Sequence, residues 1–423
     1  MTTKILVVSD DGVSTGYGRI SMETNRRLVK RGYHVMAASL GYDGLLPASY
    51  DGEPLPYHVA SLQGKPNWPD LVVQLVGAYQ PDIIHVIQDA PYAVTVKAGP
   101  YDWSKYGFMV TTPVDGSPIY PAWVELGKKA DALMTISQFG VNTWRKAGVG
   151  AQLTRPGVAL NTFYPLNNDK RAEIRKQLGI EQDAFVVGTM AQNQGRKAIS
   201  LMLKAFMEFA QDKPNARYLM DMDEQSPAGW DIPALCIQNN WDVSKIIFRS
   251  ECNRKGITEL RERYNMLDVH MVISHREGFG LPLPESQACG VVAMALDYTS
   301  GTEICGNGYG VLVKPLDFSV PGTWGGAEDY FPDMKDFVAK LQWLHDNPSE
   351  RAAIAARGMA EARSHTWDQA VDVVQANIEK VLERRKKLTA QAPVAFPQAP
   401  QTAIMNSSEP LPQSVDGLAL VEA

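Results

Sequence analysis

The sequence predicts an α/β protein with two Rossmann-like domains, each built on a parallel β-sheet. Short apolar runs rich in β-branched residues, such as 4–9 and 82–87, are typical of strands that helices cover on both faces. They alternate with amphipathic segments of helical period, of which 198–210 is the clearest. The 423 residues are too many for one core, and a proline-bounded stretch at 155–165 separates two such alternating series.

The composition indicates a globular protein. Hydrophobic residues make up 45% and charged residues 21%, and the net charge of -6 argues against indiscriminate nucleic-acid binding. No run of about 18 apolar residues is present, and residues 1–10 resemble a strand rather than a charged-then-apolar leader. We therefore expect a cytoplasmic protein that neither spans a membrane nor carries an export signal.

Cysteine and histidine spacing argues against a metal site. The four cysteines form no C-x-x-C pair and are expected to be free thiols in a reducing compartment. His270 and His275 are five positions apart, which does not match the spacing of H-E-x-x-H. We expect neither a metal nor a cofactor. The cysteines are Cys236, Cys252, Cys289 and Cys305.

Basic side chains gather on the predicted N-terminal helix. These side chains form either a solvated helix face or a surface that contacts an anionic acceptor or a membrane. No stable protein partner is predicted. The cluster comprises Arg26, Arg27, Lys30 and Arg31, and Lys128, Lys129, Arg145 and Lys146 lie further along the chain.

A glycine-bearing turn, D-D-G-V-S-T-G-Y-G-R, follows the first predicted strand. It joins strand 4–9 to a helix expected from about Arg19 to Lys30, and a second strand covers 33–39. In such a βαβ unit the turn lies at the carboxyl end of the strand, where open α/β sheets bind ligands. The glycines do not spell G-x-G-x-x-G, so no dinucleotide site is predicted.

The strongest functional signal lies at 269–285. A predicted strand, 269–274, is followed by a glycine turn and by a helix expected over 281–289. Amide groups at such a helix N-terminus favour an anionic or hydroxyl-rich ligand. Glu277 and Glu285 bracket the turn, and their carboxylates can accept hydrogen bonds from hydroxyl groups. The pattern predicts a sugar site.

This segment, E-GFGLPLP-E, resembles the E-x7-E element of the retaining glycosyltransferases of the GT-B architecture, specifically the family 4 group. The resemblance covers about residues 4–385. It implies that Glu277 holds hydroxyls of the donor sugar and that Glu285 holds the ribose of the nucleotide. The other donor-binding positions it implies are Gly16, Gly18, Gly278, Phe279, Gly280, Leu281, Ser300, Gly301 and Thr302.

The resemblance also suggests residues that meet the reacting atoms. Arg196 and Lys197, at the entrance of the helix 198–210, would contact the diphosphate, which gains charge as it leaves. Val114 or Asp115 takes the place where many family members carry a histidine near the anomeric carbon. Asp115 is the only ionisable candidate, although a simple turn residue is an equal interpretation. Gln192 and Ala159 stand where related sequences often have an arginine and an aspartate.

The implied architecture is α/β GT-B, with two facing Rossmann-like domains and a C-terminal helix that returns to the first domain. We expect an acceptor domain at 1–162, a nucleotide-sugar domain at 163–365 and the returning helix at 366–388. Residues 389–423 contain five prolines and no Lys or Arg, and they are expected to form a disordered tail. Glu303 is expected to cap the segment that follows it.

The sequence therefore predicts a retaining, metal-independent glycosyltransferase that uses a UDP- or GDP-sugar. The acceptor hydroxyl is expected on a glycan, a lipid or a modified nucleobase. One alternative is a catalytically silent binder of nucleotide sugars or glycans, which the departures at Asp115, Ala159 and Gln192 favour. Another is a glycoside hydrolase that uses Glu277 and Glu285 as its paired carboxyl groups, which leaves the basic pair at 196–197 without a role.

Overall fold

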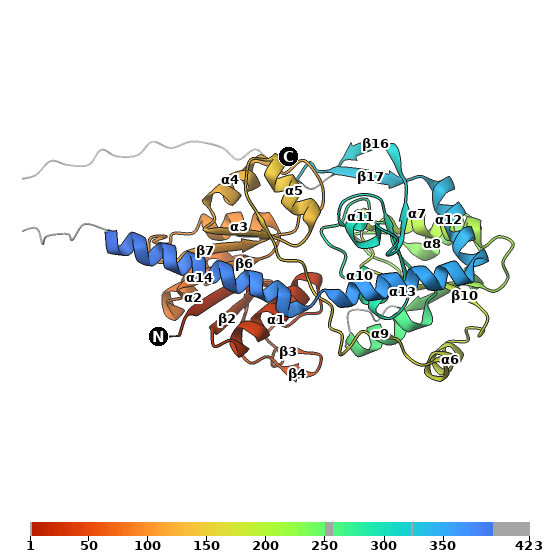
Figure 1. Ribbon diagram of the computed structural model, residues 1–423, viewed down its shortest axis with the longest axis horizontal. Coiled ribbons are helices and arrows are strands. Elements are labelled where there is room, and N and C mark those ends of the chain that lie inside the picture. Colours follow the sequence, from red (N-terminus) through yellow and green to blue (C-terminus); the bar gives the residue numbers. More distant parts are fainter. Residues whose placement is uncertain (1, 250–256, 323–324, 392–423) are drawn as a thin grey trace, which may run out of the picture.

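The structure is a computed structural model that describes residues 2–249, 257–322 and 325–391. Two β-sheets, each made of parallel strands, lie side by side, and each has helices on both faces (Figure 1). The predicted α/β fold with two Rossmann-like domains is confirmed. Cys252, and the part of the predicted tail from residue 392 onward, lie outside the described residues.

The first sheet has seven parallel strands whose carboxyl ends lie along one edge. Val8 pairs with Val86, so the loops that follow β1 and β6 leave the sheet side by side. In spatial order the strands are β5 (His58–Ser61), β2 (His34–Ser39), β1 (Lys4–Ser9), β6 (Ile83–Ile87), β7 (Gly107–Thr111), β8 (Ala132–Thr135) and β9 (Gln152–Leu153).

Five helices from residues 16–146 cover the first sheet, and a small hairpin adjoins it. Two of these helices, α3 and α4, are not predicted from the sequence; α3 reads A-P-Y-A-V-T-V-K, where apolar residues show no helical period. The elements are α1 (Gly16–Lys30), α2 (Trp68–Tyr79), α3 (Ala90–Lys97), α4 (Pro121–Lys129) and α5 (Gln138–Lys146), with the hairpin β3 (Ser49–Tyr50) and β4 (Glu53–Pro54).

The second sheet has six parallel strands. The predicted strand at 269–274 lies at its centre beside the strand at 185–190, and apolar side chains are buried on both faces. In spatial order the strands are β12 (Ile246–Arg249), β11 (Ala216–Asp221), β10 (Phe185–Met190), β13 (Val269–Val272), β14 (Val292–Leu296) and β15 (Val311–Val313).

Helices surround this sheet as well, and an antiparallel hairpin of β16 (Pro315–Pro321) and β17 (Glu328–Pro332), which is not predicted, follows β15. The helices are α6 (Asn168–Gln177), α7 (Ile199–Phe209), α8 (Ile232–Gln238), α9 (Ile257–Met266), α10 (Pro282–Ala288), α11 (Ser300–Cys305), α12 (Met334–Asp346) and α13 (Pro348–Ser364). Short 3-10 turns, η1 (Gly195–Lys197) and η2 (Val243–Lys245), precede α7 and β12.

The final helix, α14 (Trp367–Gln391), crosses back from the second domain and lies along the first (Figure 1). Val374 and Ile378 are buried in one apolar cluster with Ile5 and Leu28 of the first domain. This burial stabilises the two-domain arrangement, as the resemblance implies. None of the helices within the described ranges combines the length and the apolar content that a bilayer crossing needs.

The basic face of α1 is largely used inside the protein. Arg27 and Arg31 both form ion pairs with Asp368 of α14, and the Arg31 Nη1 atom lies 2.7 Å from the carboxylate of Asp372. These pairs fix α14 on α1. Fewer basic side chains of this helix are therefore available to an anionic acceptor or a membrane than the sequence suggests. Such a contact remains a prediction.

Candidate active site

The candidate site lies where the carboxyl edges of the two sheets meet. The guanidinium of Arg19, on α1, forms an ion pair with the carboxylate of Glu285, on α10. Further along the interface, a Cβ atom added to Gly278 would lie 2.6 Å from Cβ of Pro113, so glycine lets loops of the two domains touch. Residues far apart in the sequence thus meet at one interdomain site.

Gly16 and Gly18 lie in the first turn of α1, not in a loop as predicted. The helix begins three residues earlier than expected because Thr15 caps it, its side chain accepting a hydrogen bond from the N–H of Gly18 at 2.9 Å. A Cβ atom at Gly18 would lie 2.1 Å from the carbonyl oxygen of Val13. Glycine is therefore required for packing at 18, and the role of both glycines toward donor phosphates remains a prediction.

Glu277 lies in the loop after β13 and is held by two cations. Its Oε2 atom contacts Nζ of Lys197 and lies 3.4 Å from Nη1 of Arg196, and the hydroxyl of Ser274 donates to it at 3.0 Å. Burial alone would raise the pKa of Glu277, but the two cations and these hydrogen bonds outweigh it and lower the pKa to about 2. The sequence-predicted carboxylate and basic pair are thus in direct contact, with the carboxylate ionised.

Glu285 makes a different set of contacts at the same interdomain site. Besides Arg19, the hydroxyl of Tyr264 on α9 donates to its Oε2 atom at 3.1 Å. Burial raises the pKa of this carboxyl, and Arg19 partly opposes the rise. A carboxylate offers about four lone-pair directions, so hydroxyl groups of a ligand can add to these two contacts. Arg19 and Tyr264 therefore orient Glu285.

The glycine turn between the two acids presents backbone rather than side chains. Phe279 and Leu281 are buried in the apolar core, so only their main chain is available to a ligand. Gly280 has φ of +81°, a conformation that favours glycine. The turn is braced by Ser300, whose hydroxyl donates to the carbonyl oxygens of Glu277 and Phe279 at 2.9 and 3.0 Å.

Ser300, Gly301 and Thr302 form the first turn of helix α11. Just before them, the hydroxyl of Thr299 accepts a hydrogen bond from the N–H of Glu277 at 3.1 Å. This segment therefore supports the loop that carries Glu277. The donor-binding role of Ser300, Gly301 and Thr302 remains a prediction.

The first domain contributes acidic groups that face the cations of the second. Asp115 is half-buried beside Gly278; its burial raises its pKa, and Arg196 opposes the rise. Asp89 accepts a hydrogen bond from the hydroxyl of Tyr17, and burial together with the nearby charge of Asp115 raises its pKa to about 6. The first-domain side of the site can therefore accept hydrogen bonds from hydroxyl groups.

Sequence reasoning missed Tyr17, Asp89, Tyr264 and Ser274, and it gave Arg19 no partner. A signal existed for Asp89, because it follows the buried strand 83–87 at the edge where parallel sheets bind ligands. Tyr264 offered no such signal, since it lies on a helix distant in sequence from Glu285. Within the described ranges no three His, Cys, Asp or Glu side chains form a group that could hold a metal ion.

Comparison with known proteins gives sequence relatives for about half the chain. Residues 250–318 match the family described as Glycosyl transferases group 1. The chain is 29% identical to the D-inositol 3-phosphate glycosyltransferase of Thermomonospora curvata over 226 residues, which are 51% of this chain and 48% of that protein. For the protein of the same name from Kineococcus radiotolerans, identity is 30% over 221 residues, 50% of this chain and 47% of that one. The chain thus spans about half the length of these relatives.

Solved structures match over most of the chain. Sucrose-phosphate synthase from Thermosynechococcus elongatus has a TM-score of 0.70 at 18% identity, covering 92% of this chain and 100% of that one. The Anabaena protein Alr3699/HepE, solved in complex with UDP and glucose, has a TM-score of 0.69 at 16% identity, covering 89% and 99%. At these identities the likeness establishes the fold, which is the two-domain GT-B arrangement.

Proposed function

We propose that this chain, whose resemblance to the glycosyl transferases group 1 family and whose GT-B fold are both confirmed, transfers a sugar from a nucleotide diphosphate donor to an acceptor hydroxyl. One observation carries the proposal. Glu277 is kept ionised by Arg196 and Lys197 beside a glycine turn. That arrangement offers an acceptor for sugar hydroxyls and two cations for a diphosphate within a single cleft.

In the proposed reaction the bond from the anomeric carbon to the diphosphate breaks, and a bond from that carbon to the acceptor oxygen forms on the same face. Arg196 and Lys197 would leave Glu277 in part and offset the charge that develops on the departing diphosphate. The acceptor proton would pass to the departing phosphate oxygen, so no separate base is needed. Because two cations already offset that charge, we expect the reaction to need no metal ion.

UDP-glucose is the first donor to test. The support is that Anabaena Alr3699/HepE, similar in fold, was solved with UDP-glucose and with UDP and glucose. The ribose of such a donor would reach Glu285, whose position Arg19 and Tyr264 fix. The acceptor named for the sequence relatives, D-inositol 3-phosphate, is not carried over, because the matched region is about half of each chain.

The test is donor binding followed by turnover. Isothermal titration with UDP-glucose and GDP-sugars should give saturable binding that Glu285→Ala weakens, and mass spectrometry should then detect a glycosylated acceptor from a panel of glycans, lipids and modified DNA. Lys170→Met, on the outer surface of α6, is the matched control and should bind the donor as the parent does. If Glu285→Ala binds the donor as tightly as the parent does, Glu285 does not hold the ribose.

Two other outcomes would replace the proposal. Donor binding without turnover on any acceptor indicates a silent binder of nucleotide sugars. Cleavage of a glycoside by water in the absence of nucleotide indicates a hydrolase, in which Glu277 and Glu285 would act as the paired carboxyl groups.

A further inference from the structure

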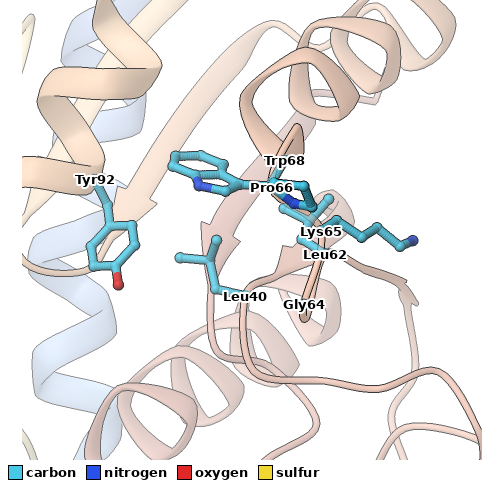
Figure 2. Close-up of a pocket in the computed structure, with 7 residues that line it drawn as sticks. All are labelled: Leu40, Leu62, Gly64, Lys65, Pro66, Trp68 and Tyr92. Atoms are coloured by element: carbon cyan, nitrogen blue, oxygen red, sulfur yellow. The ribbon is translucent and has the colours of Figure 1, made fainter. Parts of the chain in front are cut away.

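A solvent-open pocket of about 380 Å³ lies at the carboxyl edge of the first sheet, outside the contacts described so far. Its volume is at the lower end of the range for small-molecule sites. Figure 2 shows the side chains of Trp68 and Tyr92 approaching from two sides, with Leu40 below them. The lining residues are Leu40, Leu62, Gly64, Lys65, Pro66, Trp68 and Tyr92.

Two aromatic rings give this pocket its character. The ring centroids of Trp68 and Tyr92 are 6.0 Å apart, and the ring planes are tilted by 48°. Trp68 is the first residue of α2 and Tyr92 lies in the first turn of α3, so both rings are carried by regular elements that hold their direction. Partly exposed aromatic faces of this kind bind the C–H faces of uncharged rings.

The spacing of strands in the first sheet gives the approximate distance from the pocket to Asp115. Leu40 follows β2 and Asp115 follows β7, and β1 and β6 lie between these strands. Neighbouring strands are about 4.8 Å apart, so three spacings put the pocket about 14 Å from Asp115. A single monosaccharide cannot reach across this span, whereas a chain of linked sugars can.

The carboxylates between the pocket and the interdomain site would disfavour anionic ligands. Asp10 and Asp89 lie between them at the ends of β1 and β6, and both contribute, after burial, to a raised pKa of the Tyr92 phenol. Carboxylates accept hydrogen bonds from hydroxyl groups and repel phosphates. Among the lining residues Lys65 is the basic one, and its Nζ atom donates to the carbonyl oxygen of Ser61 at 2.7 Å.

We propose that the Trp68–Tyr92 pocket is a distal acceptor subsite that binds an uncharged sugar ring of an oligosaccharide. This inference rests on the proposed function, because it assigns the acceptor of that same cleft. The reactive hydroxyl then lies near Asp115, and a sugar further along the acceptor chain passes Asp89 and stacks in the pocket. A phosphate-bearing polyol and a DNA strand are the acceptors that these carboxylates disfavour.

The test uses the full chain on an array of neutral oligosaccharides of increasing length, with inositol phosphate and a single-stranded DNA oligonucleotide as further probes. Binding should appear only for oligosaccharides long enough to reach the pocket, and Trp68→Ala should weaken it roughly three- to tenfold. Trp68→Phe keeps an apolar ring at the start of α2 and should restore most of the binding. Trp343→Ala removes an exposed indole from α12 in the other domain and should change nothing.

Donor titration separates the failure of this inference from the failure of the proposed function. If UDP-glucose binds but no neutral oligosaccharide does, or if Trp68→Ala binds oligosaccharides as the parent does, the subsite is wrong and the transferase remains. Binding of inositol phosphate or DNA that Lys65→Ala abolishes also overturns the subsite. If no nucleotide sugar binds at all, the proposed function itself fails.

Discussion

The ion pair between Arg19 and Glu285 offers a direct measure of how firmly the two domains are joined. The side chains are 14% and 4% exposed, so solvent screens the pair little. Replacing Arg19 by Met removes the cation, keeps most of the apolar stem and leaves a buried carboxylate without its main partner. We expect this single change to destabilise the protein more than any substitution in an exposed ion pair.

The magnitude follows from the surroundings of Glu285. Breaking a buried ion pair by removing one partner costs about 3–5 kcal/mol. Here the Tyr264 hydroxyl, 3.1 Å from Oε2, remains as a donor, and burial already raises the pKa of Glu285, so the carboxyl can take up a proton. Both features lower the cost, and we expect Arg19→Met to destabilise by about 2–3 kcal/mol.

A double-mutant cycle isolates the pair. Arg19→Met combined with Glu285→Gln should cost less than the two single changes together, with a coupling of about 2 kcal/mol. Urea unfolding followed by tryptophan fluorescence and by far-UV circular dichroism gives the free energies, provided that the two probes coincide, since a two-domain chain can unfold in steps. The control is Lys170→Met, because Lys170 and Glu173 are 42% and 54% exposed and should lose at most about 0.5 kcal/mol. An Arg19→Met cost no larger than that of the control would refute a buried interdomain pair.

Three further predictions concern the cleft. The lowered pKa of Glu277 gives stability that is complete above about pH 4.5 and is lost as the pH falls toward about 2, so thermal melting should fall more steeply over that range in the parent than in Glu277→Gln. The pKa of Asp89 is raised to about 6, so its carboxyl becomes increasingly neutral below that pH. The acceptor KM should therefore fall as the pH rises through about 6. Asp89→Asn should remove this pH dependence and leave the donor Kd unchanged. Gly280→Ala should lower the free energy of unfolding by about 1–3 kcal/mol and weaken donor binding, because φ is +81° and the new Cβ would lie 3.2 Å from Cγ of Glu277. Gly77→Ala is the control. It lies in open space on α2 and should not destabilise the protein in a denaturation assay.

Strand periodicity was enough to predict the two sheets. The runs 4–9, 82–87 and 269–274 are apolar at most positions and largely buried, as expected of a sheet covered on both faces. What periodicity could not predict is structure fixed by contacts from elsewhere. Helix α3 is short and apolar without a helical period, and the hairpin at 315–332 carries exposed Phe318 and Val320 in place of clean alternation.

Site residues divide along the same line. Glu277, Arg196 and Lys197 were predicted from a strand end and a helix entrance, because parallel topology brings such positions to one edge. Their mutual contact depends on β10 pairing with β13, which is a choice of strand order that no local pattern encodes. The sequence could thus identify these three residues of the second domain, but it could not predict which of them contact each other.

Contacts between the domains were the least predictable, and Glu303 explains why. It was expected to cap its own segment, yet its carboxylate accepts hydrogen bonds from the N–H of Gln138 at 2.9 and 3.2 Å, at the start of α5 in the other domain. A carboxylate at a helix N-terminus is favourable whichever part of the chain supplies it. The same holds for Glu285, whose cation comes from α1. Because both acids find partners in the other domain, separating the domains would remove the cation of Glu285 and the amide donor of Glu303, and this loss disfavours separation.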